Sequence, residues 1–274
     1  MVDILDLPAP APDFVLPYGP NPLQFGELRL PRGPGPHPVA IAIHGGFWRA
    51  AYDLAHLGHL CAALAAEGIA TWSLEYRRIG HAGGAFPGTF TDVATGADHI
   101  RRISRDHHLD LSRAVAIGHS AGGQLALWLA GRARLPRSSG IWTPDPLALR
   151  GVVSLAGVSD LPRAFELNLG DGVVGSLLGG TPAQVPQRYA EASPRALLPF
   201  GIRIALVHGA DDDIVPASMS GEFIRAARTA GDDATLELLQ DTGHFEVIDP
   251  RTPQWAAVLR SVRAALSGAI RYRS

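Results

Sequence analysis

The stretch Gly118-His119-Ser120-Ala121-Gly122-Gly123-Gln124 follows the apolar run Ala114-Val115-Ala116-Ile117 and precedes a helix-like segment from Leu125 to Ala130. This order predicts a strand, a tight turn and a helix, with Ser120 on the turn. A serine hydroxyl is a poor nucleophile until a base removes its proton. A turn that exposes Oγ needs almost no side chain on either side, which Gly118 and Gly122 provide. The context therefore predicts that Ser120 is a nucleophile.

Apolar runs bounded by loop residues recur along the chain and alternate with helical patterns. Runs that are apolar on both faces, separated by amphipathic helices, are typical of a mostly parallel sheet covered on both sides, and the predicted fold class is therefore α/β. The predicted strands are Val39–Ile43, Ile69–Leu74, Ala114–Ile117, Val152–Leu155, Ile204–Val207 and Ala234–Leu239. The predicted helices are Leu54–Glu67, Asp92–Asp106, Gln124–Arg132, Ser218–Ala230 and Trp255–Leu266.

Two segments depart from this alternation of predicted strands and helices. After a Pro-rich lead from Leu7 to Pro22, the segment Phe25–Leu30 alternates like an edge strand. Between about residues 157 and 199 no strand pattern occurs, and glycines and prolines interrupt short helical pieces. We interpret this interval as a cap or lid insertion over the carboxyl ends of the strands. The expected organisation is a single domain, residues 1–274, that carries this insertion.

Composition narrows the class of protein. The chain has 274 residues, of which 46% are hydrophobic, and a formal net charge of −2. A chain with this charge is not expected to bind nucleic acid or an anionic membrane, which attract strongly basic surfaces. The single cysteine, Cys61, lies in an apolar helical pattern and is expected to be a buried structural thiol. No secretion signal or membrane-spanning run is recognisable, so we expect a cytoplasmic protein.

A base for Ser120, and a group that orients this base, are expected at the ends of later strands. The strand Ile204–Val207 runs into an acidic loop that contains Asp211, Asp212 and Asp213. His244 follows the last core strand and a glycine, as no other histidine does. Nucleophile, acid and histidine in this order are the arrangement of α/β hydrolases.

The chain resembles that superfamily at the acidic loop as well. The spacing His-Gly-x-x-Asp-x-x-Val-Pro, common in α/β-hydrolase esterases and peptidases, occurs from His208 to Pro216. The resemblance implies that Asp212 is the orienting carboxylate, with Asp211 and Asp213 as solvated loop residues. It also implies an α/β-hydrolase fold.

A second motif, His44-Gly45-Gly46-Phe47-Trp48, follows the strand Val39–Ile43. An oxyanion hole needs backbone N–H groups that converge on the developing alkoxide, and glycines let the chain approach the substrate closely. We therefore predict Gly46, Phe47 and Ala121 as donors. His44 is expected to brace the loop by a hydrogen bond. The alternative is an ordinary strand-to-helix turn with a buried tryptophan.

The form His-Gly-Gly-x-Trp is similar to that of kynurenine formamidases and related bacterial esterases. Further points of resemblance are Glu75-Tyr76-Arg77, Asp92 after Phe86-Pro87-Gly88, and Ala192-Ser193-Pro194. The resemblance extends roughly from Pro17 to Leu266. It implies the fold and the triad more firmly than the substrate.

Other residues and short patterns are weaker indications of a functional site. Trp48 and Tyr189 are candidates for the substrate pocket wall, and Glu75 and Arg77 either bind substrate or form a bracing salt bridge. His56-x-x-His59 lacks a third metal ligand and favours packing or surface placement. Gly170-x-Gly172-x-x-Gly175 does not follow a strand and is rejected as a dinucleotide motif. No metal or organic cofactor is expected.

Three functions fit these patterns. The first is a serine hydrolase that cleaves a carboxylic ester through Ser120, Asp212 and His244 and an acyl-enzyme. The second is arylformamidase, which would use the same residues to hydrolyse N-formylkynurenine. The third is a binding protein that keeps the fold without the chemistry. The expected partner is a small-molecule ester or amide, and the expected assembly is a monomer or homodimer.

Overall fold

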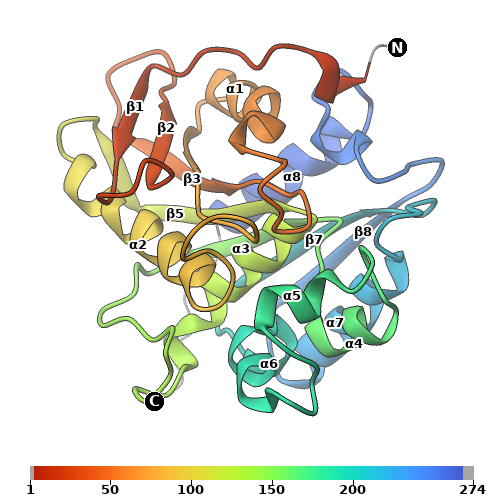
Figure 1. Ribbon diagram of the computed structural model, residues 1–274. Helices are drawn as coiled ribbons and strands as arrows, with labels where there is room; N and C mark the ends of the chain where they lie inside the picture. Colours follow the sequence, from red (N-terminus) through yellow and green to blue (C-terminus); the bar gives the residue numbers. More distant parts are fainter. Residues whose placement is uncertain (1–2, 268–274) are drawn as a thin grey trace.

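The computed structural model describes residues 3–267 and contains one sheet of eight strands in the order β1-β2-β4-β3-β5-β6-β7-β8 (Figure 1). Strands β3 to β8 are mutually parallel, whereas β1 and β2 pair antiparallel at one side. The strands are β1 (Phe14–Pro17), β2 (Phe25–Arg29), β3 (His37–Ile43), β4 (Ala70–Leu74), β5 (Leu109–His119), β6 (Gly151–Leu155), β7 (Arg203–Gly209) and β8 (Ala234–Leu239).

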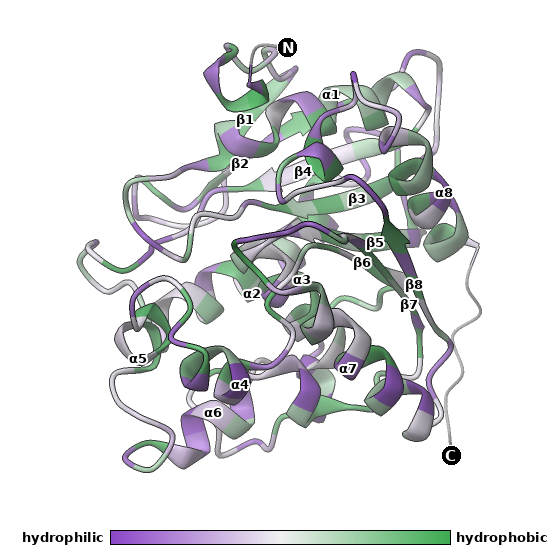
Figure 2. Cartoon of the chain, turned by 90° about the vertical axis from the view of Figure 1, so that its right-hand side faces the viewer, coloured by the Kyte–Doolittle hydropathy of each residue, from purple (hydrophilic) through white to green (hydrophobic). Residues whose placement is uncertain are grey.

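Helices cover both faces of this sheet. Figure 2 shows α1 and α8 on one face and α2, α3 and α7 on the other. The α-helices are α1 (Gly58–Ala66), α2 (Gly88–Ile103), α3 (Ala121–Gly131), α4 (Leu161–Glu166), α5 (Val173–Leu178), α6 (Pro186–Ala192), α7 (Ala217–Thr229) and α8 (Trp255–Leu266). The 3-10 helices are η1 (Ile4–Asp6), η2 (Leu54–Leu57), η3 (Arg132–Arg134), η4 (Pro194–Leu197) and η5 (Glu246–Ile248).

Two hydrophobic clusters explain why the central strands are continuously apolar. In β3, Ile41 and Ile43 pack in the cluster on the side of α2, α3 and α7. Their neighbours Ala40 and Ala42 pack in the cluster on the side of α1 and α8. Successive strand residues point to opposite faces, so a strand buried on both sides has no polar alternation. The predicted α/β class is confirmed.

The order of the strands reverses direction at β3. From β3 the chain passes to β4 on one side of β3 and then to β5 on its other side. Ligands of open α/β sheets bind where the chain reverses direction in this way. The loop that begins at His44 and the turn at Ser120 follow β3 and β5, respectively, and therefore meet at this point.

One strand prediction was wrong in its placement. The segment Phe25–Leu30 does form a strand, β2, but it lies between β1 and β4 and is not an edge. The edge strand on this side of the sheet is β1, which lies in the Pro-rich lead and contains no buried residue. Proline is tolerated at a sheet edge because one side of such a strand needs no partner.

The interval 157–199 contains three short α-helices, α4 to α6, and the 3-10 helix η4. They gather beside α7 in Figure 1. The interval is fastened to the sheet through α3, because the side chains of Gln124 and Trp128 donate to the carbonyls of Ala192 and Glu191, respectively. None of the helices within residues 3–267 is long and apolar enough to cross a membrane.

Candidate active site

Ser120 lies on a strained turn between β5 and α3. Its backbone has φ 55° and ψ −120°, a conformation that side-chain-bearing residues rarely adopt. Two hydrogen bonds hold the turn, from the Ser120 N–H to the Leu155 carbonyl at 2.9 Å and from the Val158 N–H to the Ser120 carbonyl at 3.3 Å. Strain of this kind persists only where the surroundings fix it, and it is common at active sites.

The two motif glycines are required by contacts between backbones. A Cβ at Gly118 would lie 2.0 Å from the Gly122 carbonyl oxygen. A Cβ at Gly122 would lie 2.0 Å from the Ile43 carbonyl oxygen and 2.4 Å from that of His44. The turn is therefore pressed against the end of β3, and no side chain could fit between them.

Among the three consecutive aspartates, Asp212 is the one that contacts His244. Its Oδ2 lies 2.7 Å from Nδ1 of His244, and its side chain is fully buried. Asp211 and Asp213 are exposed. Because Nδ1 of His244 donates to a carboxylate, Nε2 carries the lone pair that a base needs.

Hydrogen bonds on both oxygens fix the Asp212 carboxylate. Oδ1 accepts from the N–H groups of Ile214 at 2.9 Å and Val215 at 2.8 Å. Oδ2 also lies 3.1 Å from Nε2 of His208, which donates to the Val215 carbonyl at 2.9 Å. Burial alone would raise the pKa of Asp212, but the hydrogen bonds from His208 and His244 hold this pKa below its ordinary value. Asp212 therefore stays ionised.

The predicted oxyanion loop lies directly beside Ser120. A Cβ at Gly45 would lie 3.1 Å from Cβ of Ser120. Gly46, Phe47 and Trp48 have φ values of 100°, 51° and 54°, so three consecutive left-handed residues bend the loop. Ala121 is the first residue of α3, where an N–H group has no partner within the helix. The predicted donors thus come from two segments that meet at Ser120.

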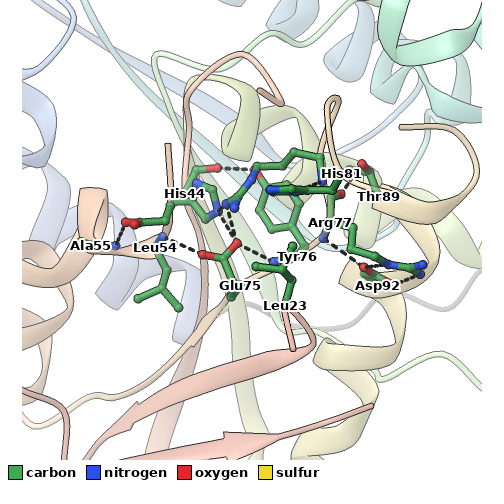
Figure 3. A network of polar contacts seen from close by, with 12 residues as sticks. Leu23, His44, Leu54, Ala55, Glu75, Tyr76, Arg77, His81, Thr89 and Asp92 are labelled. Atoms are coloured by element: carbon green, nitrogen blue, oxygen red, sulfur yellow. Dashed lines mark hydrogen bonds and ion pairs between the residues drawn. The ribbon is translucent and has the colours of Figure 1, made fainter. Parts of the chain in front are cut away.

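A buried ion pair braces this loop from below (Figure 3). The guanidinium of Arg78 bonds Oε1 of Glu75 and lies 2.9 Å from Nε2 of His44. The His44 Nδ1 donates to the Gly45 carbonyl at 2.8 Å, and the Tyr76 hydroxyl donates to the His44 carbonyl at 2.9 Å. Burial would raise the pKa of Glu75, but His44 and Arg78 hold it below its ordinary value. Glu75 is therefore a bracing residue.

Arg77 has a similar role beside this network. Its Nε and Nη2 bind the two carboxylate oxygens of Asp92 at 2.8 and 2.7 Å, respectively (Figure 3). This two-point pairing joins the segment after β4 to α2 and matches the alternative of a bracing salt bridge.

The interval 157–199 reaches the predicted oxyanion loop at Gly170. Nη2 of Arg49 donates to the Gly170 carbonyl at 2.5 Å. A Cβ at Gly170 would lie 2.8 Å from the Phe47 ring. The loop and the interval are therefore joined at Gly170 by this hydrogen bond, and the Phe47 ring leaves no room there for a side chain.

The two predicted pocket-wall residues have packing contacts instead of exposed surface. Trp48 is fully buried, and its Nε1 donates to Oε1 of Gln124 at 3.0 Å. Tyr189 is 3% exposed, its hydroxyl donates to the Gly180 carbonyl at 3.1 Å, and its ring packs edge-on against Phe165. Burial raises the pKa of Tyr189 to about 12. A contact of either side chain with substrate stays a prediction.

Two histidines of the site were given no role from the sequence. His208 is fully buried beside Asp212, and its Nδ1 accepts from the Ser220 hydroxyl at 2.7 Å. His119 is fully buried beside His244. Both belong to motifs that contain an assigned residue: His119 directly precedes Ser120, and His208 stands four residues before Asp212. This proximity is the signal that the sequence offers.

Comparison with known proteins places the chain in a family. Residues 28–226 match the BD-FAE family. Over 242 residues the chain is 28% identical to a protein from Oryza sativa subsp. japonica named probable isoprenylcysteine alpha-carbonyl methylesterase ICME. The match covers 84% of this chain and 57% of that relative, so the chain spans little more than half of its length.

Solved structures with the same fold are esterases by their names. A truncated carbohydrate esterase from gut microbiota superposes with a TM-score of 0.81 at 19% identity, covering 96% of this chain and 98% of the other. Esterase B from Lactobacillus rhamnosis gives a TM-score of 0.77 at 19% identity, with coverages of 94% and 88%. Est2 of Thermogutta terrifontis gives 0.74 at 18% identity, with coverages of 92% and 91%.

The chain therefore belongs to the BD-FAE family and has the α/β-hydrolase fold. The finer resemblance to kynurenine formamidases stays a prediction.

Proposed function

We propose that this protein is a serine hydrolase that cleaves carboxylic esters through Ser120, His244 and Asp212. The contact that carries the proposal is the 2.7 Å hydrogen bond between Nδ1 of His244 and the buried, ionised Asp212. It leaves the lone pair of His244 Nε2 available to act as a base, in a site where the end of β5 carries Ser120, a strained and buried serine.

The reaction follows from these roles. Oγ of Ser120 attacks the ester carbonyl while its proton passes to Nε2 of His244, and Asp212 stabilises the imidazolium that forms. The N–H groups of Gly46, Phe47 and Ala121 donate to the oxyanion. The tetrahedral intermediate expels the alcohol, which takes the proton from His244. Water then attacks the acyl-enzyme with His244 as base, and Ser120 regains its proton.

The ester reading is supported by the names of the relatives. The rice relative is named as a methylesterase, and the structures with the same fold are named as esterases. A formamide would require the same residues but a very small acyl site. We therefore propose an ester as the substrate class, with arylformamidase as the competing activity.

Ser120→Ala combined with matched substrates tests the proposal. The wild-type protein should hydrolyse p-nitrophenyl acetate or butyrate, and Ser120→Ala should lower kcat by at least about 10³-fold. A fluorophosphonate should add one phosphonyl group to the wild-type chain, seen by intact mass, and none to the variant. Ser138→Ala, at an exposed position outside the site, serves as the control.

The other functions correspond to other outcomes. A kcat/KM for N-formylkynurenine equal to or above that for the best ester would replace the ester reading by arylformamidase. A wild-type protein with neither turnover nor labelling would favour a binding protein. Undiminished turnover in Ser120→Ala would refute the assigned nucleophile.

A further inference from the structure

His119 occupies the position immediately before the proposed nucleophile and is fully buried. Its ring centre lies 4.5 Å from that of His244 and 4.9 Å from that of His56. His56 belongs to η2, the 3-10 helix that follows the predicted oxyanion loop. His119 is the last residue of β5, and its ring therefore touches segments that follow two other strands of the sheet, β3 and β8.

The hydrogen bonds of His119 define which of its nitrogens carries a proton. Nε2 lies 2.9 Å from the His244 carbonyl oxygen, which only accepts, so Nε2 carries the hydrogen. In a neutral ring Nδ1 is then an acceptor. Nε2 of His56 lies 2.7 Å from this Nδ1 and donates to it. His56 thus selects the His119 tautomer that can donate to His244.

The charge state of the pair agrees with this pattern. Burial, together with the neighbouring His244 and His56, lowers the pKa of His119 well below its ordinary value. Burial, with smaller contributions from His44 and His244, lowers the pKa of His56 to about 3. The ionised Asp212 opposes the shift of His119 only in part. Both rings are therefore neutral at neutral pH, and neither places a positive charge beside His244 when its imidazolium forms.

We propose that His119 is a positioning residue of the hydrolase reaction, which holds the backbone of His244 at a fixed place relative to Ser120 in the tautomer that His56 selects. The proposal rests on the proposed function. His244 lies in an irregular loop between β8 and η5, where neither strand nor helix fixes its backbone. The bond to His119 joins this loop directly to the residue next to Ser120.

Such a bond matters because transfer of a proton between Oγ and Nε2 depends on their separation. A misplacement of about 1 Å at a reacting group costs on the order of 10²-fold in rate. Asp212 holds His244 by its ring, whereas His119 holds it by its backbone. One anchor thus acts on the side chain and the other on the main chain, and together they fix both the position and the orientation of the imidazole.

His119→Gln and His119→Asn form a matched pair of variants. A glutamine places an N–H donor at about the reach of histidine Nε2, whereas an asparagine reaches only about as far as Nδ1. We expect His119→Asn to lower kcat by about 10- to 100-fold, with KM for p-nitrophenyl butyrate almost unchanged. His119→Gln should retain kcat within about threefold of the wild type. His107→Asn, which removes a histidine outside the site, is the control.

Active-site titration with a fluorophosphonate makes the comparison independent of folding yield, since kcat is then expressed per reactive serine. His56→Leu adds a second test, because it leaves His119 in place but removes the group that selects its tautomer. We expect this variant to lower kcat without changing KM, by less than His119→Asn does.

The inference is overturned if kcat of His119→Asn per titrated site equals that of the wild type, or if His119→Gln loses as much as His119→Asn. Either result would reduce His119 to a packing residue. Ser120→Ala separates this failure from failure of the proposed function. Loss of turnover in Ser120→Ala with no effect at His119 would reject only the positioning role, whereas turnover that survives Ser120→Ala would reject the assigned nucleophile.

Discussion

Oδ2 of Asp212 is shared by two histidines, with Nδ1 of His244 at 2.7 Å and Nε2 of His208 at 3.1 Å. The sharing holds the carboxylate in one orientation while leaving its charge available to His244. The exposed Asp211 and Asp213 have no comparable environment, although they are its immediate neighbours in sequence.

Asp212→Asn is expected to lower kcat by about 10³- to 10⁴-fold, because an amide can present a donor to Nδ1 and favour the wrong tautomer of His244. Steady-state hydrolysis of a p-nitrophenyl ester gives the measurement. Asp211→Asn, at the exposed neighbouring position, should remain within about twofold of the wild type. Equal losses in the two variants would contradict the role assigned to Asp212.

Gly122→Ala is expected to destabilise the fold by more than about 3 kcal/mol, because the new Cβ would meet the rigid carbonyl oxygens at the end of β3. Chemical denaturation measures this loss, or the variant fails to fold. Gly140 offers a control, since a Cβ at this position would have no atom within 4 Å. Gly140→Ala should change the free energy of unfolding by no more than about 1 kcal/mol. A Gly122→Ala variant with unchanged stability would show that the turn is not pressed against β3.

Glu75→Gln tests the buried brace beneath the oxyanion loop. Both partners of the Glu75–Arg78 pair have side chains only 3% exposed. Removing one charge leaves the other buried without compensation, so we expect a loss of about 3–5 kcal/mol in the free energy of unfolding. The surface pair Arg260–Glu237, with side chains 64% and 37% exposed, provides the control. Glu237→Gln should cost about 0–1 kcal/mol, and similar losses in both variants would argue against the brace.

The neutral His56 predicts a pH dependence of stability. Its pKa is about 3 in the folded protein and 6.5 ordinarily, so between these values the unfolded chain binds a proton that the folded chain does not. The contribution of His56 is therefore full above pH 6.5 and is lost as the pH falls toward 3. The slope is at most about 1.4 kcal/mol per pH unit for one such histidine.

Denaturation between about pH 7.5 and 4.5 compares the wild type with His56→Gln. We expect the stability of the wild type to fall more steeply below about pH 6.5 than that of the variant. Above about pH 7 the two slopes should coincide, because His56 is neutral in both states there. Parallel curves across the whole range would show that His56 titrates normally in the folded protein.

The parallel part of the sheet could be predicted from the sequence because a strand that is buried on both faces has a continuous run of apolar residues. The strand β1 could not, since its apolar run is only three residues long, stands among prolines and leaves Phe14 and Val15 41% and 57% exposed. It is held by pairing with β2, an interaction between backbones that leaves no side-chain pattern.

In the candidate site, too, some residues could be predicted from the sequence and others could not. Ser120 and His244 could be predicted because each follows a core strand with characteristic glycines, whereas the choice of Asp212 depended on resemblance, since three adjacent carboxylates look alike in a sequence. His119 acts on a carbonyl 125 residues away, which no local pattern encodes. For Trp48 the sequence leaves both a core position and the pocket wall open, and its burial and its hydrogen bond with Gln124 are what the structure adds.

The hydrogen bond from Arg49 to the Gly170 carbonyl links the interval 157–199 to the predicted oxyanion loop. In the proposed reaction, a movement of the segment around Gly170 that admits a bulky ester would also pull on the loop that contains Gly46 and Phe47. If both predicted roles hold, the segment that limits the size of the substrate is thus joined to the loop that stabilises the oxyanion. A segment grafted from a relative to change the substrate range would therefore need a hydrogen-bond acceptor for Arg49 and a glycine beside Phe47. A segment without them would be expected to displace the loop and to lower the rate of the proposed reaction.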